Sequence, residues 1–189
     1  MLEEVLIAGF GGQGIMSTGQ LLAYAGMQEG KHVAWIPSYG PEMRGGTANC
    51  GVTISDRLIS SPLVTEPTCL IAMNQPSLEK YAATVVPDGV IFYNSSLINA
   101  EGTAAPCRIF GIPANAIAED LGNVRVACNV VLGAYLGYSE VITVEAAIRA
   151  LEKVLPPHRH KLIPVNQRAL ERGAALGHQY RKGGAQVGS

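Results

Sequence analysis

The sequence predicts an α/β fold: a Rossmann-like, mostly parallel sheet flanked by helices, followed by a helical C-terminal third. Over residues 4–112, short apolar runs bounded by glycines or prolines alternate with segments of helical spacing. From Val124 onward the spacing is helical throughout. Hydrophobic residues make up 48% of the chain and charged residues 15%, which is typical of strands buried on both faces, or of a subunit that buries apolar surface against partners.

The first elements form a β-α-β unit. Residues 4–9 are a short apolar run that stops at a glycine cluster, which is typical of a buried strand. From Ile15 the apolar residues have helical spacing, and Gly30 ends the helix. Residues 32–37 are predicted to be the second strand. We expect the crossover between the two strands to be right-handed.

Later elements follow the same alternation. Further strands are predicted at 47–55, 69–73, 89–93 and 108–112. Further helices are predicted at 76–85, 115–121, 127–136, 144–155 and 164–180. We expect one domain over residues 1–181 and a flexible, glycine-rich tail over residues 182–189.

Charge and hydropathy exclude several partners. The net charge is −1, so no broad basic field attracts nucleic acid or anionic lipid. No apolar run reaches the roughly 20 residues that a membrane helix needs. The acidic start, residues 1–4, passes directly into a strand without the pattern of a secretory signal. We therefore expect a cytoplasmic protein with no nucleic-acid or membrane partner.

The four cysteines are Cys50, Cys69, Cys107 and Cys128, which stand far apart in the sequence. Iron–sulfur clusters and structural zinc normally use closely spaced thiolates, and the chain has no C-x-x-C pair. We expect buried or half-buried free thiols and no metal site.

The glycine-rich turn after the first strand is the main candidate site. Gly9, Gly11 and Gly14 fit the pattern G-x-G-x-x-G, and Gly12 and Gln13 complete the turn. Such glycines permit a tight turn, close approach of a ligand to the backbone, and close packing of helix on strand. The free N–H groups at the start of the helix favour an anion such as a phosphate. Alternatively, the glycines serve only helix–strand packing or receive the backbone of a partner chain.

Two nucleotide-binding patterns are incomplete at this turn. An NAD-dependent dehydrogenase uses an acidic residue at the end of the second strand to bind the ribose hydroxyls. Here that strand ends at Pro37 and Ser38, and the next acidic residue is Glu42, inside the following loop. No Gly-Lys-Ser/Thr follows the turn, so the P-loop pattern is missing too. The sequence therefore disfavours NAD and P-loop nucleotide binding.

The loop after the second strand, residues 38–46, is the other candidate. It contains hydroxyl groups, one carboxylate, one guanidinium and three glycines. Arg44 beside Gly45 and Gly46 is suited to holding a phosphate or carboxylate, or else Glu42 and Arg44 pair with each other. We expect the loop to leave the carboxyl end of the second strand next to the glycine turn, where open α/β sheets bind ligands.

Together these motifs resemble a known family. The residues that carry the resemblance are Gly11-Gly12-Gln13-Gly14-Ile15, Ser38-Tyr39-Gly40-Pro41-Glu42-Met43-Arg44-Gly45-Gly46 and Ile59-Ser60-Ser61-Pro62. At this spacing they closely resemble the gamma subunit of 2-oxoacid:ferredoxin oxidoreductases, in the pyruvate/ketoisovalerate oxidoreductase gamma domain family. The resemblance covers nearly the whole chain. The short length of the chain favours the 2-oxoglutarate or branched-chain type, with 2-oxoglutarate as the first choice.

The resemblance implies a complex that oxidatively decarboxylates a 2-oxoacid, forms acyl-CoA and reduces ferredoxin. Thiamine diphosphate and Mg²⁺ are then expected in the alpha and beta subunits, and Fe–S clusters in the delta subunit. This chain is expected to have no catalytic residue and no activity alone, to pack on the catalytic subunits and to help handle CoA.

The residues expected to bind the cofactor are Gly9, Gly11, Gly12, Gln13, Gly14, Ser38, Tyr39, Gly40, Glu42, Arg44, Gly45 and Gly46. Two alternatives stay open. One is a subunit of indolepyruvate:ferredoxin oxidoreductase, and the other is a free-standing nucleotide-binding regulatory module.

Overall fold

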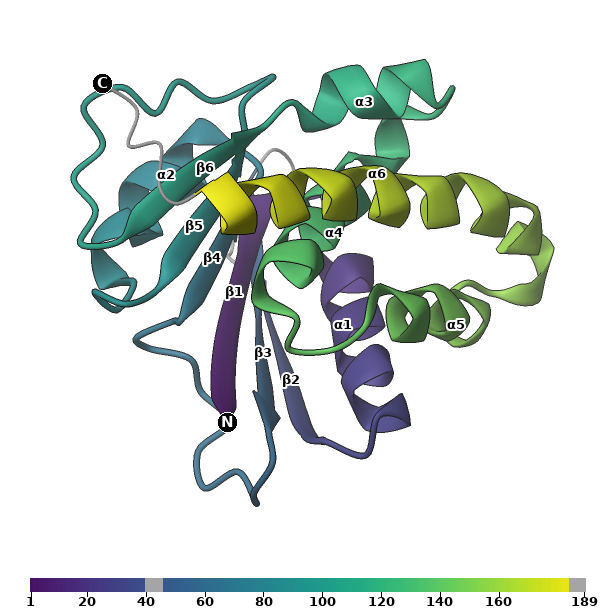
Figure 1. Cartoon of the computed structure of the whole chain (residues 1–189), viewed down its shortest axis with the longest axis horizontal. Coiled ribbons are helices and arrows are strands. Elements are labelled where there is room, and N and C mark those ends of the chain that lie inside the picture. Colours follow the sequence, from purple (N-terminus) through teal and green to yellow (C-terminus); the bar gives the residue numbers. More distant parts are fainter. Residues whose placement is uncertain (40–45, 184–189) are drawn as a thin grey trace.

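A six-stranded mixed sheet forms the centre of the molecule, in the order β2-β3-β1-β4-β5-β6 (Figure 1). The computed structural model describes residues 1–39 and 46–183. The strands are β1 (Leu2–Phe10), β2 (His32–Tyr39), β3 (Thr47–Ser55), β4 (Cys69–Ala72), β5 (Val90–Asn94) and β6 (Arg108–Ile112). All of them lie where the sequence predicted strands, with boundaries shifted by up to two residues.

The pairing of the strands confirms a mostly parallel sheet. β1, β4, β5 and β6 pair in parallel with one another, in that order. β3 pairs antiparallel with both β1 and β2, so β2 runs in the same direction as β1. The first crossover therefore skips one position, because β3 lies between the two strands that the β-α-β unit connects.

Helices cover both faces of this sheet (Figure 1). They are α1 (Ile15–Gln28), α2 (Gln75–Tyr81), α3 (Ala114–Asp120), α4 (Ala127–Ser139), α5 (Val144–Val154) and α6 (Ile163–Gly183). Val5 and Ile7 of β1 belong to the larger core under α1, α4, α5 and α6, whereas Leu6 belongs to the smaller core under α2. Burial on both faces explains why β1 is continuously apolar rather than alternating.

Three helix ends differ from the sequence prediction by three residues or more. Helix α4 continues to Ser139, beyond the predicted end at residue 136. The helix expected over residues 76–85 ends as an α-helix at Tyr81 and continues as a 3-10 turn, Ala82–Thr84. Helix α6 continues to Gly183, so Lys182 and Gly183 are helical rather than part of the expected tail. The rest of that tail, residues 184–189, lies outside the described residues.

The closest helix contact joins α4 and α6 through glycines on both helices. A Cβ atom added at Gly173 would lie 1.9 Å from the carbonyl oxygen of Val130, and one at Gly177 would lie 2.0 Å from that of Ala134. On the opposing helix, a Cβ at Gly133 would lie 2.2 Å from the carbonyl oxygen of Leu170. The two backbones therefore touch directly, and the crossing leaves no room for side chains at these positions.

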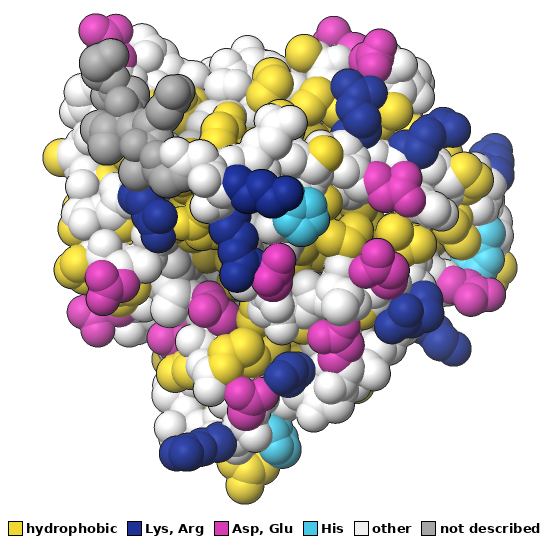
Figure 2. Space-filling view, in the orientation of Figure 1, with side chains coloured by type: hydrophobic (Ala, Val, Ile, Leu, Met, Phe, Trp, Pro, Cys, Tyr) yellow, Lys and Arg dark blue, Asp and Glu magenta, His cyan; other side chains and the backbone are white. Residues whose placement is uncertain are grey.

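The surface carries charges of both signs. Figure 2 shows basic and acidic side chains interspersed over one face of the molecule, in keeping with a net charge of −1. None of the helices in the described ranges is long and apolar enough to cross a membrane.

Candidate functional site at the glycine turn

The turn between β1 and α1 requires a glycine at its first position because its neighbours fill the space of a side chain. Gly9 is buried in the last part of β1. A Cβ atom there would lie 2.6 Å from Oε1 of Gln13, 2.8 Å from Cδ1 of Ile15 and 2.9 Å from Cβ of Met73. The structure thus shows the tight turn predicted for this glycine, and it places the close packing of helix on strand here rather than at Gly14.

Gly12 and Gly14 are required for a different reason. Their φ angles are 90° and 82°, in the left-handed region that favours glycine. A Cβ at Gly12 would meet nothing within 4 Å, so the constraint there is the backbone conformation alone. Gly14 is the N-cap residue of α1 and gives no side-chain cap. The start of α1 therefore has no side-chain cap, and Ser17 is the exposed residue of its first turn, whereas Ile15 is buried.

Gln13 stabilises the turn from inside. Its Oε1 accepts a hydrogen bond from the backbone N–H of Phe10 at 2.7 Å, and its Nε2 donates to the carbonyl oxygen of Met73 at 3.2 Å. The side chain thus links the ends of β1 and β4. Both ends of its amide are engaged within the protein, so Gln13 shapes the turn, and its role at a cofactor site stays a prediction.

The first turn of α1 presents hydrogen-bond donors. The carbonyl oxygen of Gly14 accepts from the N–H of Thr18 at 2.9 Å and from Oγ of Ser17 at 3.1 Å. Within the described residues, the backbone N–H groups of Ile15, Met16 and Ser17 have no acceptor. Such groups, together with the helix dipole, attract anions.

These donors lie at a groove of about 590 Å³ beside the turn, a size common for small-molecule sites. Its described lining is Phe10, Gly11, Gly12, Gly14, Ile15, Met16, Ser17, Gln20, Gly46, Thr47 and Ala48. No titratable side chain is among them, so this described lining offers anions only backbone N–H groups, hydroxyls and one amide side chain.

The second predicted loop reaches the same groove through its last residue. The N–H of Gly11 donates to the carbonyl oxygen of Gly46 at 3.3 Å. β3 begins directly after Gly46 and pairs with β1, with Thr47 opposite Phe10. The expectation that this loop lies next to the glycine turn is therefore confirmed at its carboxyl end.

The other loop residues are more distant or not described. Ser38 and Tyr39 are the last residues of β2, which is separated from β1 by β3. Gly40, Glu42, Arg44 and Gly45 lie outside the described residues. Their roles stay predictions.

Further residues that were not predicted as site residues also line the groove: Phe10, Ile15, Met16, Ser17, Gln20, Thr47 and Ala48. Met16 and Gln20 are four residues apart, so they lie on one face of α1. That spacing was visible in the sequence, but the sequence did not show which face of the helix is open. The position of β3 beside β1, which brings Thr47 and Ala48 to the groove, has no local sequence signal.

The order of the strands gives a structural reason against NAD. In the dinucleotide-binding fold the second strand lies next to the first, so that its acidic residue reaches the ribose. Here β3 occupies that position. The end of β2 is therefore two strand spacings, about 10 Å, from the end of β1, and it carries Ser38 rather than an acid.

Asn129 has a structural role. Oγ1 of Thr18 donates to its Oδ1 at 2.8 Å, and its Nδ2 donates to Oδ1 of Asn166 at 2.7 Å. Asn166 in turn donates to the carbonyl oxygen of Leu162 at 2.9 Å. This chain of hydrogen bonds joins α1, α4 and α6 behind the glycine turn.

The cysteines are buried as predicted: Cys50, Cys69 and Cys128 fully, and Cys107 partly. Burial raises the pKa of the Cys50 and Cys128 thiols to about 12. Among the described residues, no group of three or more His, Cys, Asp or Glu side chains is placed to hold a metal ion.

These thiols predict a pH dependence of stability. Above pH about 8.5 the unfolded chain loses thiol protons that the folded chain keeps up to pH about 12, so the folded state binds more protons. The free energy of unfolding should therefore fall as pH rises from 8 to 10. Urea titrations at these two pH values measure the fall. In the Cys50→Ala, Cys128→Ala double variant the fall should be smaller, and an equal fall would contradict the assignment.

Comparisons with known proteins place the chain in a family. The family model described as pyruvate ferredoxin/flavodoxin oxidoreductase matches residues 4–176. The chain belongs to this family. The resemblance that the two glycine-bearing motifs predicted is therefore confirmed, and the fold agrees with it.

Two relatives and one solved structure illustrate the similarity. Ketoisovalerate oxidoreductase subunit VorA of Methanothermobacter thermautotrophicus is 43% identical over 171 residues, which are 90% of this chain and 35% of that protein. 2-Oxoglutarate synthase subunit KorC of Methanocaldococcus jannaschii is 30% identical over 159 residues, 82% of this chain and 85% of KorC. The keto/oxoacid ferredoxin oxidoreductase gamma subunit of Geobacter sulfurreducens superimposes with a TM-score of 0.80 at 28% identity, covering 94% of this chain and 99% of that one. This family member thus spans only about a third of the length of VorA.

Proposed function

We propose that this chain is the gamma subunit of a 2-oxoacid:ferredoxin oxidoreductase and that its glycine turn contributes to the site for CoA. The observation that carries the proposal is the groove at the start of α1. The open N–H groups of Ile15, Met16 and Ser17 suit the phosphate oxygens of CoA. The apolar surface of Phe10 and Met16 suits its pantetheine arm.

In this proposal the chemistry takes place on partner subunits. The 2-oxoacid is decarboxylated on thiamine diphosphate, held with Mg²⁺ by alpha and beta subunits. Electrons pass through Fe–S clusters of a delta subunit to ferredoxin, and the acyl group passes to CoA. The length of VorA, of which this chain matches 35%, supports a family member that works beside further domains. The cytoplasm stays the predicted compartment.

Two substrates are candidates. The sequence favours 2-oxoglutarate, and the relative KorC, at 30% identity, is named as a subunit of 2-oxoglutarate synthase. VorA, named for ketoisovalerate, is more similar at 43% identity. We therefore propose a branched-chain 2-oxoacid as the substrate of the complex, with 2-oxoglutarate as the second candidate.

The test is an assay of the complex purified anaerobically from its native cells. Ferredoxin reduction is measured with 2-oxoisovalerate, 2-oxoglutarate, pyruvate and indolepyruvate, each with and without CoA. We expect CoA-dependent reduction that is fastest with 2-oxoisovalerate. Faster turnover of 2-oxoglutarate or indolepyruvate would overturn the choice of substrate. Equal rates with and without CoA would overturn the role of the groove.

A further inference from the structure

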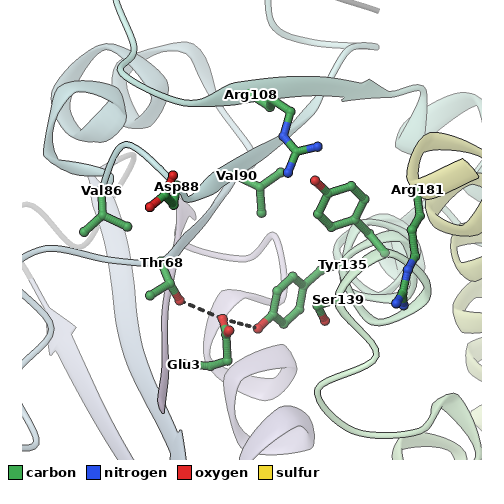
Figure 3. Close-up of a pocket in the computed structure, with 10 residues that line it drawn as sticks. Glu3, Thr68, Val86, Asp88, Val90, Arg108, Tyr135, Ser139 and Arg181 are labelled. Atoms are coloured by element: carbon green, nitrogen blue, oxygen red, sulfur yellow. Dashed lines mark hydrogen bonds between the residues drawn. The ribbon is translucent and has the colours of Figure 1, made fainter. Parts of the chain in front are cut away.

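Another cavity, of about 520 Å³, lies at the opposite end of the sheet from the glycine turn. Four parallel strands contribute residues at or just before their amino ends: Glu3 for β1, Thr68 for β4, Val90 for β5 and Arg108 for β6 (Figure 3). The C-terminal parts of α4 and α6 complete its wall. The proposed CoA groove and this cavity share no lining residue.

One side of the cavity is acidic. Oε2 of Glu3 accepts hydrogen bonds from Oγ1 of Thr68 at 2.7 Å and from the hydroxyl of Tyr135 at 3.2 Å, as Figure 3 shows. Tyr135 is 1% exposed, and burial raises its pKa well above the ordinary range, so it remains a donor. Within the described residues, no Lys or Arg lies within ion-pair distance of Glu3. A half-buried carboxylate in this position attracts a cation.

The other side is basic. The guanidinium of Arg108 lies over the ring of Tyr138, 5.4 Å from its centroid, and no described carboxylate pairs with it. Arg181, near the end of α6, also lines the cavity and pairs with Glu140. Figure 2 shows basic side chains gathered around this end of α6. A guanidinium that is free of a protein partner is suited to bind a carboxylate with two parallel hydrogen bonds.

We propose that this cavity binds an aliphatic α-amino acid. A simple anion would be repelled by Glu3 and Asp88, and a simple cation would be repelled by Arg108. Arg181, by contrast, is already paired with Glu140. A ligand with both charges pairs its ammonium group with Glu3 and its carboxylate with Arg108. Val86 and Val90 supply an apolar wall for its side chain. The volume lies within the range of small-molecule sites.

Calorimetric titration of the full chain tests this with L-valine and two analogues that each keep one charge. 3-Methylbutanoate lacks the ammonium group, and 2-methylpropylamine lacks the carboxylate. We expect L-valine to bind at one site, and both analogues to bind at least about tenfold more weakly, because each leaves one charged group unpaired. Failure of L-valine to bind, or equally tight binding of either analogue, would overturn the proposal.

Two variants locate the site. Arg108→Gln and Glu3→Gln should each weaken L-valine binding by about tenfold or more, since each removes one charge–charge contact. Arg149→Gln, at an exposed position on α5, is the matched control and should bind as the native chain does. Arg108 is exposed, so its variant tests the proposal even if Glu3→Gln disturbs folding. Unchanged binding by Arg108→Gln would refute it. Because the titration needs no partner subunit, its result does not depend on the proposed function.

Discussion

Replacing Gly173 by alanine is expected to lower the free energy of unfolding by about 3 kcal/mol, at the upper end of the usual cost of overpacking a core. The added Cβ would lie 1.9 Å from the carbonyl oxygen of Val130, an atom of the backbone that has no rotamer by which to move away. Helices α4 and α6 must therefore separate, and the packing along their whole crossing loosens. Urea denaturation followed by circular dichroism measures the change.

The matched control lies on the same helix. Gly183 is also in α6, but a Cβ there meets nothing within 4 Å. Gly183→Ala should leave stability unchanged or raise it slightly, because alanine is the better helix former. Equal effects of the two substitutions would show that the contact between α4 and α6 is not as close as described.

Replacing Ser17 by glutamate is expected to raise the KM for CoA of the assembled complex by about tenfold, which corresponds to about 1.4 kcal/mol. Ser17 lines the groove at the third position of α1. An acidic residue there stabilises the helix by about 0.3–1 kcal/mol through the helix dipole, so folding should not suffer. The same negative charge repels the phosphates of CoA from the N–H groups that we propose bind them.

The neutral variant Ser17→Gln separates charge from size in this test. It adds a side chain of the same length without the charge, so its KM for CoA should rise much less than that of Ser17→Glu. Steady-state assays at varied CoA concentration give both values. If both variants raise KM equally, or if neither does, the groove does not bind the phosphates of CoA.

Much of the fold could be predicted because its elements carry strong local patterns. The buried apolar run of β1 and the glycines after it were enough to predict the first strand and the turn that follows it. The place of β3 between β1 and β2 could not be predicted. The sequence of residues 47–55 predicts a strand but does not show which strands lie beside it. Likewise, Val64 packs against Gly51 of this strand from a loop that has no regular sequence pattern.

The candidate site was predictable in part for the same reason. Gly9 has the tight-turn role that the motif predicted, because a turn of this kind is a local structure. Gly14 is required for its left-handed φ angle rather than for the predicted close packing of helix on strand. Gln13 differs, since its partner Met73 lies 60 residues away. The cavity beside Glu3 gave no sequence signal at all, because its residues come from β1, β5, β6, α4 and α6 and meet only in the folded chain.

The most direct test of the central claim is affinity purification of this chain, tagged, from its native cells under anaerobic conditions. We predict that subunits containing thiamine diphosphate and Fe–S clusters copurify with it in fixed stoichiometry and that the assembly oxidises a 2-oxoacid. If the chain instead purifies alone, or as a small homo-oligomer that binds an adenine nucleotide, it is not a subunit of such an oxidoreductase.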